Sequence, residues 1–246
     1  MTQSFVIAAI AAMMATGCAD PATTQKLADL ENKVAELEKK VAAGPARGAA
    51  PAGASAAEEE AANDLMQQLS KAMTAMDYDA AKKLADEVVT KYGKTKAARA
   101  VARMKGELDV IGRDAPSLAV DHWFQGETSL NSDDATLLVF WEVWCPHCKR
   151  EVPKLEATYQ SWKDKGVNVV GLTKQSRDVS DAQVSEFVSG NGISYAVARE
   201  KGQTMSDAFG VRGVPAAAVV KDGKIVWRGH PARITDDMLK SWAGEG

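Results

Sequence analysis

The chain has 246 residues, of which 46% are hydrophobic, so it can hold one large domain or two small ones with a sizeable core. Its formal net charge is -3 and it contains no long basic block, which argues against nucleic-acid binding and against a polybasic membrane patch. Cys18 stands far from the other cysteines, whereas Cys145 and Cys148 are separated by two residues. The composition therefore directs attention to chemistry at this pair and leaves Cys18 to a separate explanation.

Residues 1–17 predict an export signal. An apolar run from Phe5 to Ala15 carries no charge and is too short to span a bilayer. The segment Ala15-Thr16-Gly17-Cys18 resembles the bacterial lipoprotein cleavage box, in which small residues precede a cysteine that becomes lipidated. We therefore expect removal of residues 1–17 and lipidation of Cys18, with a plain secretory signal or a retained anchor as the alternatives. In each case the mature chain would lie on the periplasmic side of a bacterial membrane, where disulfides persist.

Residues 18–43 contain a heptad pattern after the anchor cysteine. Apolar side chains fall at Leu27, Leu30, Val34, Leu37 and Val41, which is the a/d spacing of a coiled coil. Lysines at the g positions and glutamates at the e positions can pair between parallel helices. We predict a homo-oligomer, a dimer or a trimer, formed through residues 23–43 and favoured by co-anchoring in one membrane. A solvated spacer helix is the alternative, because so few heptads are marginal alone.

Two further segments precede the cysteine pair. Residues 44–57, GPARGAAPAGASAA, lack periodicity and are rich in Ala, Gly and Pro, which is typical of a flexible linker. Residues 58–112 favour helix throughout, with breaks near Asp77 and Gly93 that divide them into about three helices. The segment resembles a single tetratricopeptide-type unit, and such units normally need neighbours. We expect a small helical spacer or docking module there, with a partner-binding role left open.

Residues 115–246 change to an α/β pattern. Six short β-rich runs alternate with helical stretches, which follow Pro146, Asp181 and Thr235. The segment Lys221-Asp222-Gly223-Lys224 predicts a tight hairpin between the last two runs. The runs are Leu118–Trp123, Thr136–Val143, Val167–Thr173, Tyr195–Ala198, Ala216–Val220 and Ile225–Arg228.

The Cys145-Pro146-His147-Cys148 motif follows an apolar strand and opens a helix, with Pro146 in a position suited to the first helical turn. The positive end of a helix stabilises a thiolate, so Cys145 is the predicted nucleophile. Cys148 lies one turn further in and is the predicted resolving thiol. His147 can add a hydrogen bond or positive charge near the thiolate, or it can face solvent without redox effect. No cofactor is expected beyond the redox-active Cys145–Cys148 disulfide.

Residues 138–153, LVFWEVWCPHCKREVP, resemble the active-site segment of the TlpA/ResA-like branch of the thioredoxin superfamily. The likeness extends to Ala115-Pro116, to Gly213-Val214-Pro215 and to the Asp222-Gly223 hairpin. It implies a thioredoxin-like fold, with a central mixed sheet flanked by helices, and disulfide exchange with protein thiols, commonly as a reductase served by a membrane redox partner. It also implies a cis Val214–Pro215 bond that faces the cysteines and offers backbone groups to an extended substrate.

Neighbouring residues refine this expectation. Glu151 matches an acidic residue of ResA-like reductases that influences thiol protonation, although it could simply complement the first turn of a helix. Trp144 can form an apolar platform for substrates beside Cys145. Val139 stands where thioredoxins carry a buried Asp. The Pro-His dipeptide is typical of oxidising DsbA-type enzymes, so the direction of electron flow stays open, with reduction slightly favoured over oxidation or isomerisation.

Two other classes of protein compete with the enzyme interpretation. A binding or scaffold lipoprotein could use the cysteines as half of a zinc site, but only His122, His147 and His230 could complete the four ligands and their spacing is not typical of a metal site, so no metal is expected. A peroxidase of the peroxiredoxin type would need Pro and Thr where Leu138 and Glu142 stand. The sequence therefore predicts a periplasmic thiol-disulfide oxidoreductase.

Overall fold

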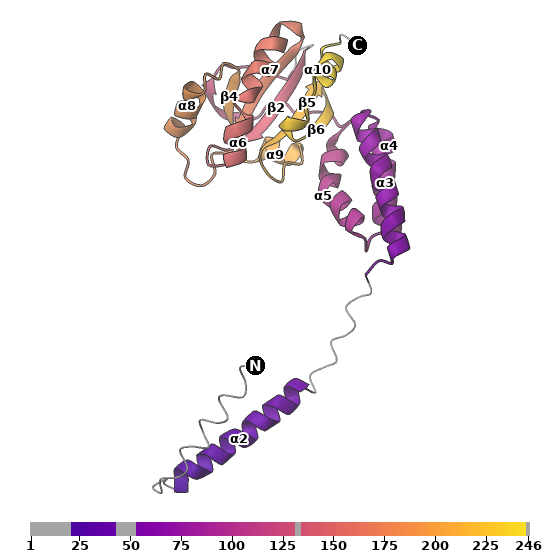
Figure 1. Cartoon of the computed structure of the whole chain (residues 1–246). Helices are drawn as coiled ribbons and strands as arrows, with labels where there is room; N and C mark the ends of the chain where they lie inside the picture. The colour runs from indigo at the N-terminus through magenta and orange to yellow at the C-terminus, as the bar shows by residue number, and fades with distance from the viewer. Residues whose placement is uncertain (1–20, 43–52, 131–133, 245–246) are drawn as a thin grey trace. The chain divides into compact units, whose positions relative to one another are not determined.

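The computed structural model describes residues 21–42, 53–130 and 134–244 (Figure 1). Contacts within the chain divide it after Gly53 into two units, which are taken separately below. The predicted signal segment, Cys18 and most of the predicted linker lie outside the described residues.

The first unit contains one described helix, α2 (Pro21–Ala42), which covers almost all of the predicted coiled-coil segment. Leu30 and Val34, at successive d and a positions, expose 59% and 51% of their surface. Apolar side chains exposed at this spacing suit a helix that pairs with a copy of itself. None of the helices that the structure describes is both long enough and apolar enough to cross a membrane.

The second unit begins with three helices: α3 (Ala56–Thr74), α4 (Tyr78–Lys91) and α5 (Lys96–Val110). Ser55 caps α3 through a reciprocal capping box, so the last two residues of the predicted linker are helical. Asp77 and Thr95 cap α4 and α5 by accepting hydrogen bonds from backbone amides three residues ahead. The predicted breaks near Asp77 and Gly93 are thereby confirmed. These helices share a small core rich in alanine: Ala62, Leu69, Ala81, Ala85, Val88, Ala97, Ala98, Val101 and Leu108.

A mixed six-stranded sheet follows, in the order β1-β4-β3-β2-β5-β6. The pairs β2–β3 and β3–β4 are parallel, whereas β1, β5 and β6 each run antiparallel to a neighbour. β3 coincides with its prediction, and β1 begins two residues later than predicted. The strands are β1 (Val120–Gln125), β2 (Ala135–Trp141), β3 (Val167–Thr173), β4 (Ala196–Glu200), β5 (Ala216–Lys221) and β6 (Lys224–Gly229).

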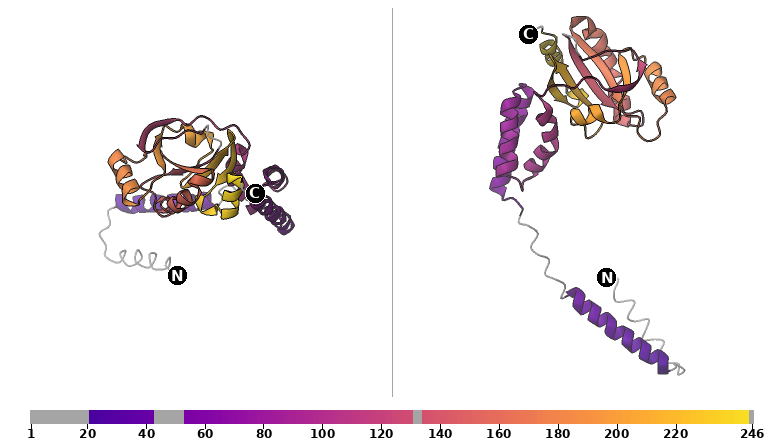
Figure 2. Two further views of the ribbon diagram at one scale, coloured as in Figure 1. Left: turned by 90° about the horizontal axis from the view of Figure 1, so that it is seen from above. Right: turned by 180° about the vertical axis from the view of Figure 1, so that it is seen from behind.

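Helices cover both faces of this sheet. Every residue of β2 is buried, and because side chains alternate along a strand, β2 contributes to two cores. Leu137 and Trp141 belong to the core with α7, α8 and α10, whereas Leu138 and Phe140 belong to the core with α9. In Figure 1, α6, α7 and α10 lie in front of the sheet, and Figure 2 gives two further views of the layers. The predicted mixed sheet flanked by helices is confirmed. Its helices are α6 (Pro146–Glu151), α7 (Lys154–Trp162), α8 (Asp181–Gly190), α9 (Thr204–Ala208) and α10 (Asp236–Ala243).

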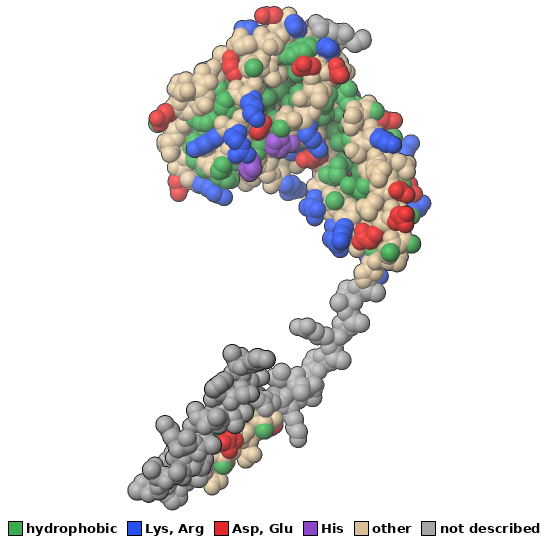
Figure 3. Space-filling model, in the orientation of Figure 1, with side chains coloured by type: hydrophobic (Ala, Val, Ile, Leu, Met, Phe, Trp, Pro, Cys, Tyr) green, Lys and Arg blue, Asp and Glu red, His purple; other side chains and the backbone are tan. Residues whose placement is uncertain are grey.

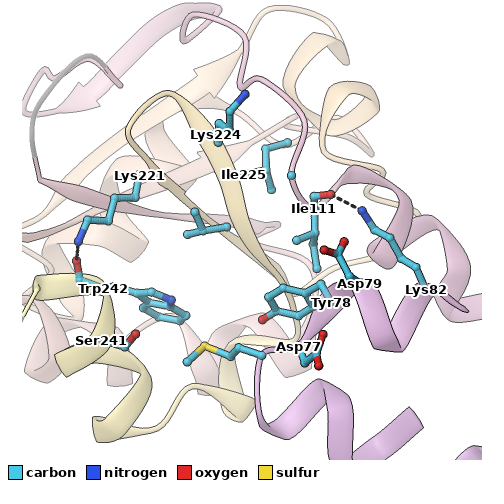
Figure 4. Close-up of a pocket in the computed structure, with 13 residues that line it drawn as sticks. Asp77, Tyr78, Asp79, Lys82, Ile111, Lys221, Lys224, Ile225, Ser241 and Trp242 are labelled. Carbon is cyan, nitrogen blue, oxygen red and sulfur yellow. Dashed lines mark hydrogen bonds between the residues drawn. The ribbon is translucent and has the colours of Figure 1, made fainter. Parts of the chain in front are cut away.

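The three-helix region is attached along the edge strand β6. The amide of Gly112 donates to the carbonyl of Ile225 at 2.8 Å, and the Lys82 ammonium donates to the carbonyl of Ile111 at 2.6 Å. A cavity of about 550 Å³ opens between α4, β6 and α10, and Figure 4 shows Tyr78 and Trp242 among its lining side chains. Burial raises the pKa of Tyr78 to about 12. This attachment covers an edge that would otherwise be open to pairing with another chain.

Candidate active site

The cysteine motif lies where β2 gives way to α6. Cys145 is the N-cap of α6: its sulfur accepts a hydrogen bond from the amide of Cys148 at 3.4 Å, and Pro146 takes the first helical turn. The amide of Cys145 donates to the carbonyl of Glu142 at 3.1 Å, which fixes the turn between strand and helix. The predicted strand-to-helix context of the motif is confirmed, and it places the Cys145 sulfur at the positive end of the helix.

The two thiols are free, and their surroundings differ. Cys145 lines a groove, although only 4% of its surface is exposed, whereas Cys148 is fully enclosed at 0%. Burial raises the pKa of Cys148 well above its ordinary value, and its hydrogen bond with Cys145 acts in the same direction. Cys148 is therefore held as a protonated thiol at neutral pH, directly beneath the sulfur that faces the groove.

The groove has a volume of about 870 Å³ and brings several predicted site residues together. Cys145, Pro146, His147, Trp144 and Val214 all line it. The Cys145 thiol lies 3.7 Å from the carbonyl oxygen of Val214. The Val214–Pro215 bond is cis, as the family resemblance implied, and Pro215 itself is buried and lines an adjacent cavity.

His147 is exposed at the rim of the groove and is engaged by Arg150. Its Nδ1 atom lies 2.6 Å from Arg150 Nη2. A guanidinium can only donate, so Nδ1 must accept and cannot carry a proton in this arrangement. Among the described side chains, the one hydrogen-bond partner of the His147 ring is thus Arg150 and not a cysteine sulfur.

Glu151 ends α6 with its side chain 16% exposed. Its ion-pair partner within the described part of the chain is Lys154, whose ammonium lies 3.1 Å away. The influence of Glu151 on the protonation of Cys148 therefore stays a prediction.

Glu142 is the site residue that sequence reasoning missed. Only 1% of it is exposed, although it lines the floor of the groove. Its carboxylate accepts hydrogen bonds from the Ser176 amide at 3.3 Å, the Ser176 hydroxyl at 3.1 Å and the Thr173 hydroxyl at 3.3 Å. A glutamate in an apolar run before the motif was a usable signal, because this residue type is almost never buried without partners. Its partners lie at the end of β3 (Thr173) and just after it (Ser176), more than thirty residues away, and could not be predicted from the local pattern.

The same network holds the loop that follows β3 and fixes Trp144. The Trp144 indole donates to the Ser176 hydroxyl at 3.0 Å, and the Arg177 guanidinium lies 3.6 Å from the centre of the Trp144 ring. Gln175, Arg177 and Asp178 have positive φ angles of 52°, 62° and 57°, which cost free energy in residues other than glycine. The loop is therefore strained, and Trp144 is held in place as one wall of the groove.

Metal ligands do not gather anywhere in the described residues: no group of three or more His, Cys, Asp or Glu side chains is placed to hold an ion there.

Comparison with known proteins shows the family to which the chain belongs. The model of the AhpC/TSA family matches residues 111–228. The thiol-disulfide oxidoreductase ResA of Bacillus thuringiensis (strain Al Hakam) is 33% identical over 119 residues, which cover 47% of this chain and 67% of the relative. The chain belongs to the ResA/StoA-type thiol-disulfide oxidoreductases of the thioredoxin superfamily. The predicted thioredoxin-like fold and the enzyme class are thereby confirmed.

Two further similar proteins have a lower sequence identity to this chain. The sporulation thiol-disulfide oxidoreductase A of Bacillus subtilis (strain 168) is 23% identical over 116 residues, covering 47% of this chain and 70% of the relative. The crystal structure of StoA from Bacillus subtilis superposes with a TM-score of 0.42 at 23% identity, covering 51% of this chain and 96% of that one. The family match begins at residue 111, so α2 and the three-helix region lie outside it.

Proposed function

We propose that the chain is a periplasmic, lipid-anchored enzyme that reduces disulfides of protein substrates through Cys145 and Cys148, with no cofactor besides this pair. The observation that carries the proposal is the asymmetry of the two thiols. Cys145 caps α6 in an open groove, whereas Cys148 is enclosed beneath it with a raised pKa. A nucleophile that borders the groove, beside a second thiol that is fully enclosed, is the arrangement that two-step exchange requires.

The reaction proceeds through a mixed disulfide. The Cys145 thiolate attacks one sulfur of a substrate disulfide, forms a new sulfur–sulfur bond and expels the other substrate sulfur as a thiolate. Cys148 then loses its proton and attacks the Cys145 sulfur, which breaks the mixed disulfide and releases the second substrate thiolate. Two electrons have passed to the substrate, and the Cys145–Cys148 disulfide remains. A dithiol partner in the membrane restores the reduced pair by the same steps in reverse.

The groove supplies the remaining roles. The Val214 carbonyl, 3.7 Å from the Cys145 thiol, offers a backbone acceptor to an extended substrate strand beside Pro215. Trp144 gives an apolar wall against which that strand can pack. Pro146 starts the helix that stabilises the thiolate, and the influence of His147 and Glu151 on thiol protonation is part of the same proposal.

Anchoring and assembly rest on the N-terminal pattern. Cys18 would carry the lipid, and residues 23–43 would join copies of the chain, for which the exposed Leu30 and Val34 of α2 give support. Metabolic labelling with a fatty acid tests the anchor: label should enter the full chain and be lost in Cys18→Ala. Label retained in Cys18→Ala would overturn lipidation at this residue.

The reduction potential of the Cys145/Cys148 pair tests the reaction. The pair is equilibrated against glutathione buffers and read by thiol trapping, with Cys145→Ser as the control that cannot form the disulfide. A potential near about -250 mV or lower supports the reductase, whereas roughly -120 to -180 mV indicates an oxidase or an isomerase. The isomerase outcome would fit an assembly that brings several reactive pairs together. Absence of a reversible disulfide would refute the proposal altogether.

A further inference from the structure

Three adjoining cavities connect the cysteine pair with the three-helix region. The active-site groove of about 870 Å³ shares Arg212 and Gly213 with a second cavity of about 210 Å³. The second shares Arg103, Glu107 and His230 with a third, of about 520 Å³. We call these three cavities together the extended groove. Helix α5 forms part of its wall, so a region outside the family match borders a path that begins at Cys145.

The extended groove is strongly cationic, although the chain as a whole carries a net charge of -3. Five basic side chains line it: Lys174, Arg212, Arg103, Arg228 and Arg233. Its two carboxylates are both engaged, because Glu142 is buried with three hydrogen-bond donors and Glu107 lies 3.3 Å from Arg233. On the face shown in Figure 3, basic side chains (blue) gather around the histidines (purple). The excess positive charge is therefore available to a ligand.

The surroundings of Arg228 give the strongest support for an anion-binding site in the second cavity. Only 2% of it is exposed, and its guanidinium donates to the backbone carbonyls of Phe209, Ala217 and Gly229. These bonds use Nε and Nη1, so Nη2 has no acceptor among the described residues. Burial lowers the pKa of Arg228, and the charge of Arg233 acts in the same direction, whereas the Glu107 carboxylate offsets only part of the shift. A carboxylate entering the second cavity would give Nη2 a hydrogen-bond acceptor and add negative charge beside the guanidinium.

Two more arginines lie at the cysteine end. Arg177 stacks on Trp144, and Arg150 contacts His147, so both are held against residues that line the groove. A guanidinium fork matches the geometry of a carboxylate, and a basic cleft raises the encounter rate of acidic ligands.

We propose that the extended groove binds the substrate as an extended protein segment whose cysteine lies at Cys145 and whose acidic side chains run past Arg212 and Arg228 toward Arg103 on α5. The inference rests on the proposed function. A small thiol that reacts with Cys145 would occupy only the first cavity, whereas three adjoining cavities can hold a longer chain. The three-helix region thus acts as the far wall of the substrate site.

Charge-matched peptides test this proposal with the full chain. Two peptides carry the same disulfide and the same matched reduction potential, and each continues into an arm of several residues, with Glu side chains in one and Lys in the other. A third peptide has no arm, and oxidised glutathione is a small anionic comparison. Rate constants for exchange with the reduced Cys145/Cys148 pair are measured by stopped-flow fluorescence at low and high salt. The acidic arm should accelerate exchange about tenfold or more over the basic arm at low salt, and the ratio should fall toward one at high salt.

Variants on α5 then locate the effect. Arg103→Glu should lower the advantage of the acidic arm severalfold, and it is suited to this because Arg103 is exposed and has no hydrogen bond or ion pair among the described residues. Arg99→Glu makes the same charge change on the same helix outside the lining of the extended groove, and it should leave the advantage intact.

The outcomes separate the two proposals. Exchange that proceeds equally fast with both arms would overturn the acidic-segment inference and leave the oxidoreductase intact. If Arg103→Glu lowers the exchange rate constants of oxidised glutathione and of the acidic peptide equally, the positive charge of the groove acts on small anions in general. This result would overturn the proposal that an extended protein segment binds there. No exchange with any of these disulfides would refute the proposed function itself.

Discussion

We predict that the Glu142 carboxylate stabilises the loop after β3, so that removing it increases local opening of this loop by a measurable amount. In Glu142→Ala the Ser176 amide loses its acceptor at 3.3 Å, and the hydroxyls of Ser176 and Thr173 lose theirs. The hydroxyls can rotate toward water, so the amide of the half-buried Ser176 dominates the loss, at up to about 2 kcal/mol for a donor left unsatisfied. The positive φ angles of Gln175, Arg177 and Asp178 favour opening, and fewer contacts then oppose it.

Hydrogen exchange measures this opening residue by residue. A loss of about 2 kcal/mol corresponds to roughly 30-fold faster exchange at the Ser176 amide, because about 1.4 kcal/mol is a factor of ten. Glu142→Gln keeps a carbonyl acceptor and should change the rate about fivefold or less. Amides within β3 serve as internal controls, and Glu151→Ala is a matched control because that carboxylate pairs with Lys154. Exchange at Ser176 within about threefold of the parent in Glu142→Ala would refute the assignment of this loop to Glu142.

Three further predictions concern the thiols and the N-terminal helix. Cys148→Ala should accumulate a mixed disulfide between Cys145 and a protein substrate, visible as an added mass that Cys145→Ser never shows. Folding raises the pKa of Cys148 above its ordinary value of 9.0. The protonated thiol therefore contributes its full stability below about pH 9, and this contribution is lost progressively as the pH rises further. Denaturant titrations should therefore show the free energy of unfolding of the reduced protein falling above about pH 9, by up to roughly 1.4 kcal/mol per pH unit from this group, and falling less steeply in Cys148→Ala. An equal slope in both proteins would contradict the burial argument. Deletion of residues 23–44, or the pair Leu30→Lys and Val34→Lys, should convert an oligomer to a monomer in sedimentation experiments, and a monomeric parent chain would end the coiled-coil hypothesis.

The sequence predicted the structure correctly where interactions between neighbouring residues determine it. The β3 strand coincides with its apolar run, and the motif from Cys145 to Cys148 opens a helix because proline and the N-terminal dipole act within one turn. The hairpin at Asp222 and Gly223 follows from backbone preferences of the same short range, and both residues have positive φ angles. Strand ends were less accurate, as at β1, because pairing with β4 decides where that strand starts.

The long-range parts of the site were out of reach. The Glu142 carboxylate has its donors in Thr173 and Ser176, which come beside it only once β3 pairs with β2. The extended groove likewise needs Arg103 on α5 and Arg228 on β6 to meet, although they are far apart in the chain. No local periodicity reports which loops and helices a sheet will bring together.

His147 is where composition and geometry lead to opposite expectations, and a double-mutant cycle decides between them. The Pro-His dipeptide predicts that His147 stabilises the Cys145 thiolate, so that His147→Ala should lower the reduction potential by tens of millivolts. The structure instead directs Nδ1 toward the Arg150 guanidinium at 2.6 Å, which keeps that nitrogen unprotonated and engaged. We therefore expect His147→Ala to change the potential by less than about 10 mV, where about 30 mV corresponds to a tenfold change in the equilibrium constant.

Removing Arg150 should release the ring. In an Arg150→Ala background, the His147 ring is free to turn toward Cys145 and to donate a hydrogen bond to its sulfur, so His147→Ala should then lower the potential by about 15 mV or more. The change in potential caused by His147→Ala is compared in the presence and absence of Arg150, so the direct influence of the Arg150 charge on the thiolate cancels. Lys149→Ala is the control for the loss of a neighbouring exposed cation. If His147→Ala lowers the potential by tens of millivolts when Arg150 is present, and by the same amount in the Arg150→Ala background, the reasoning is refuted. The Pro-His dipeptide would then set the potential, and the Arg150 contact would have no effect on it.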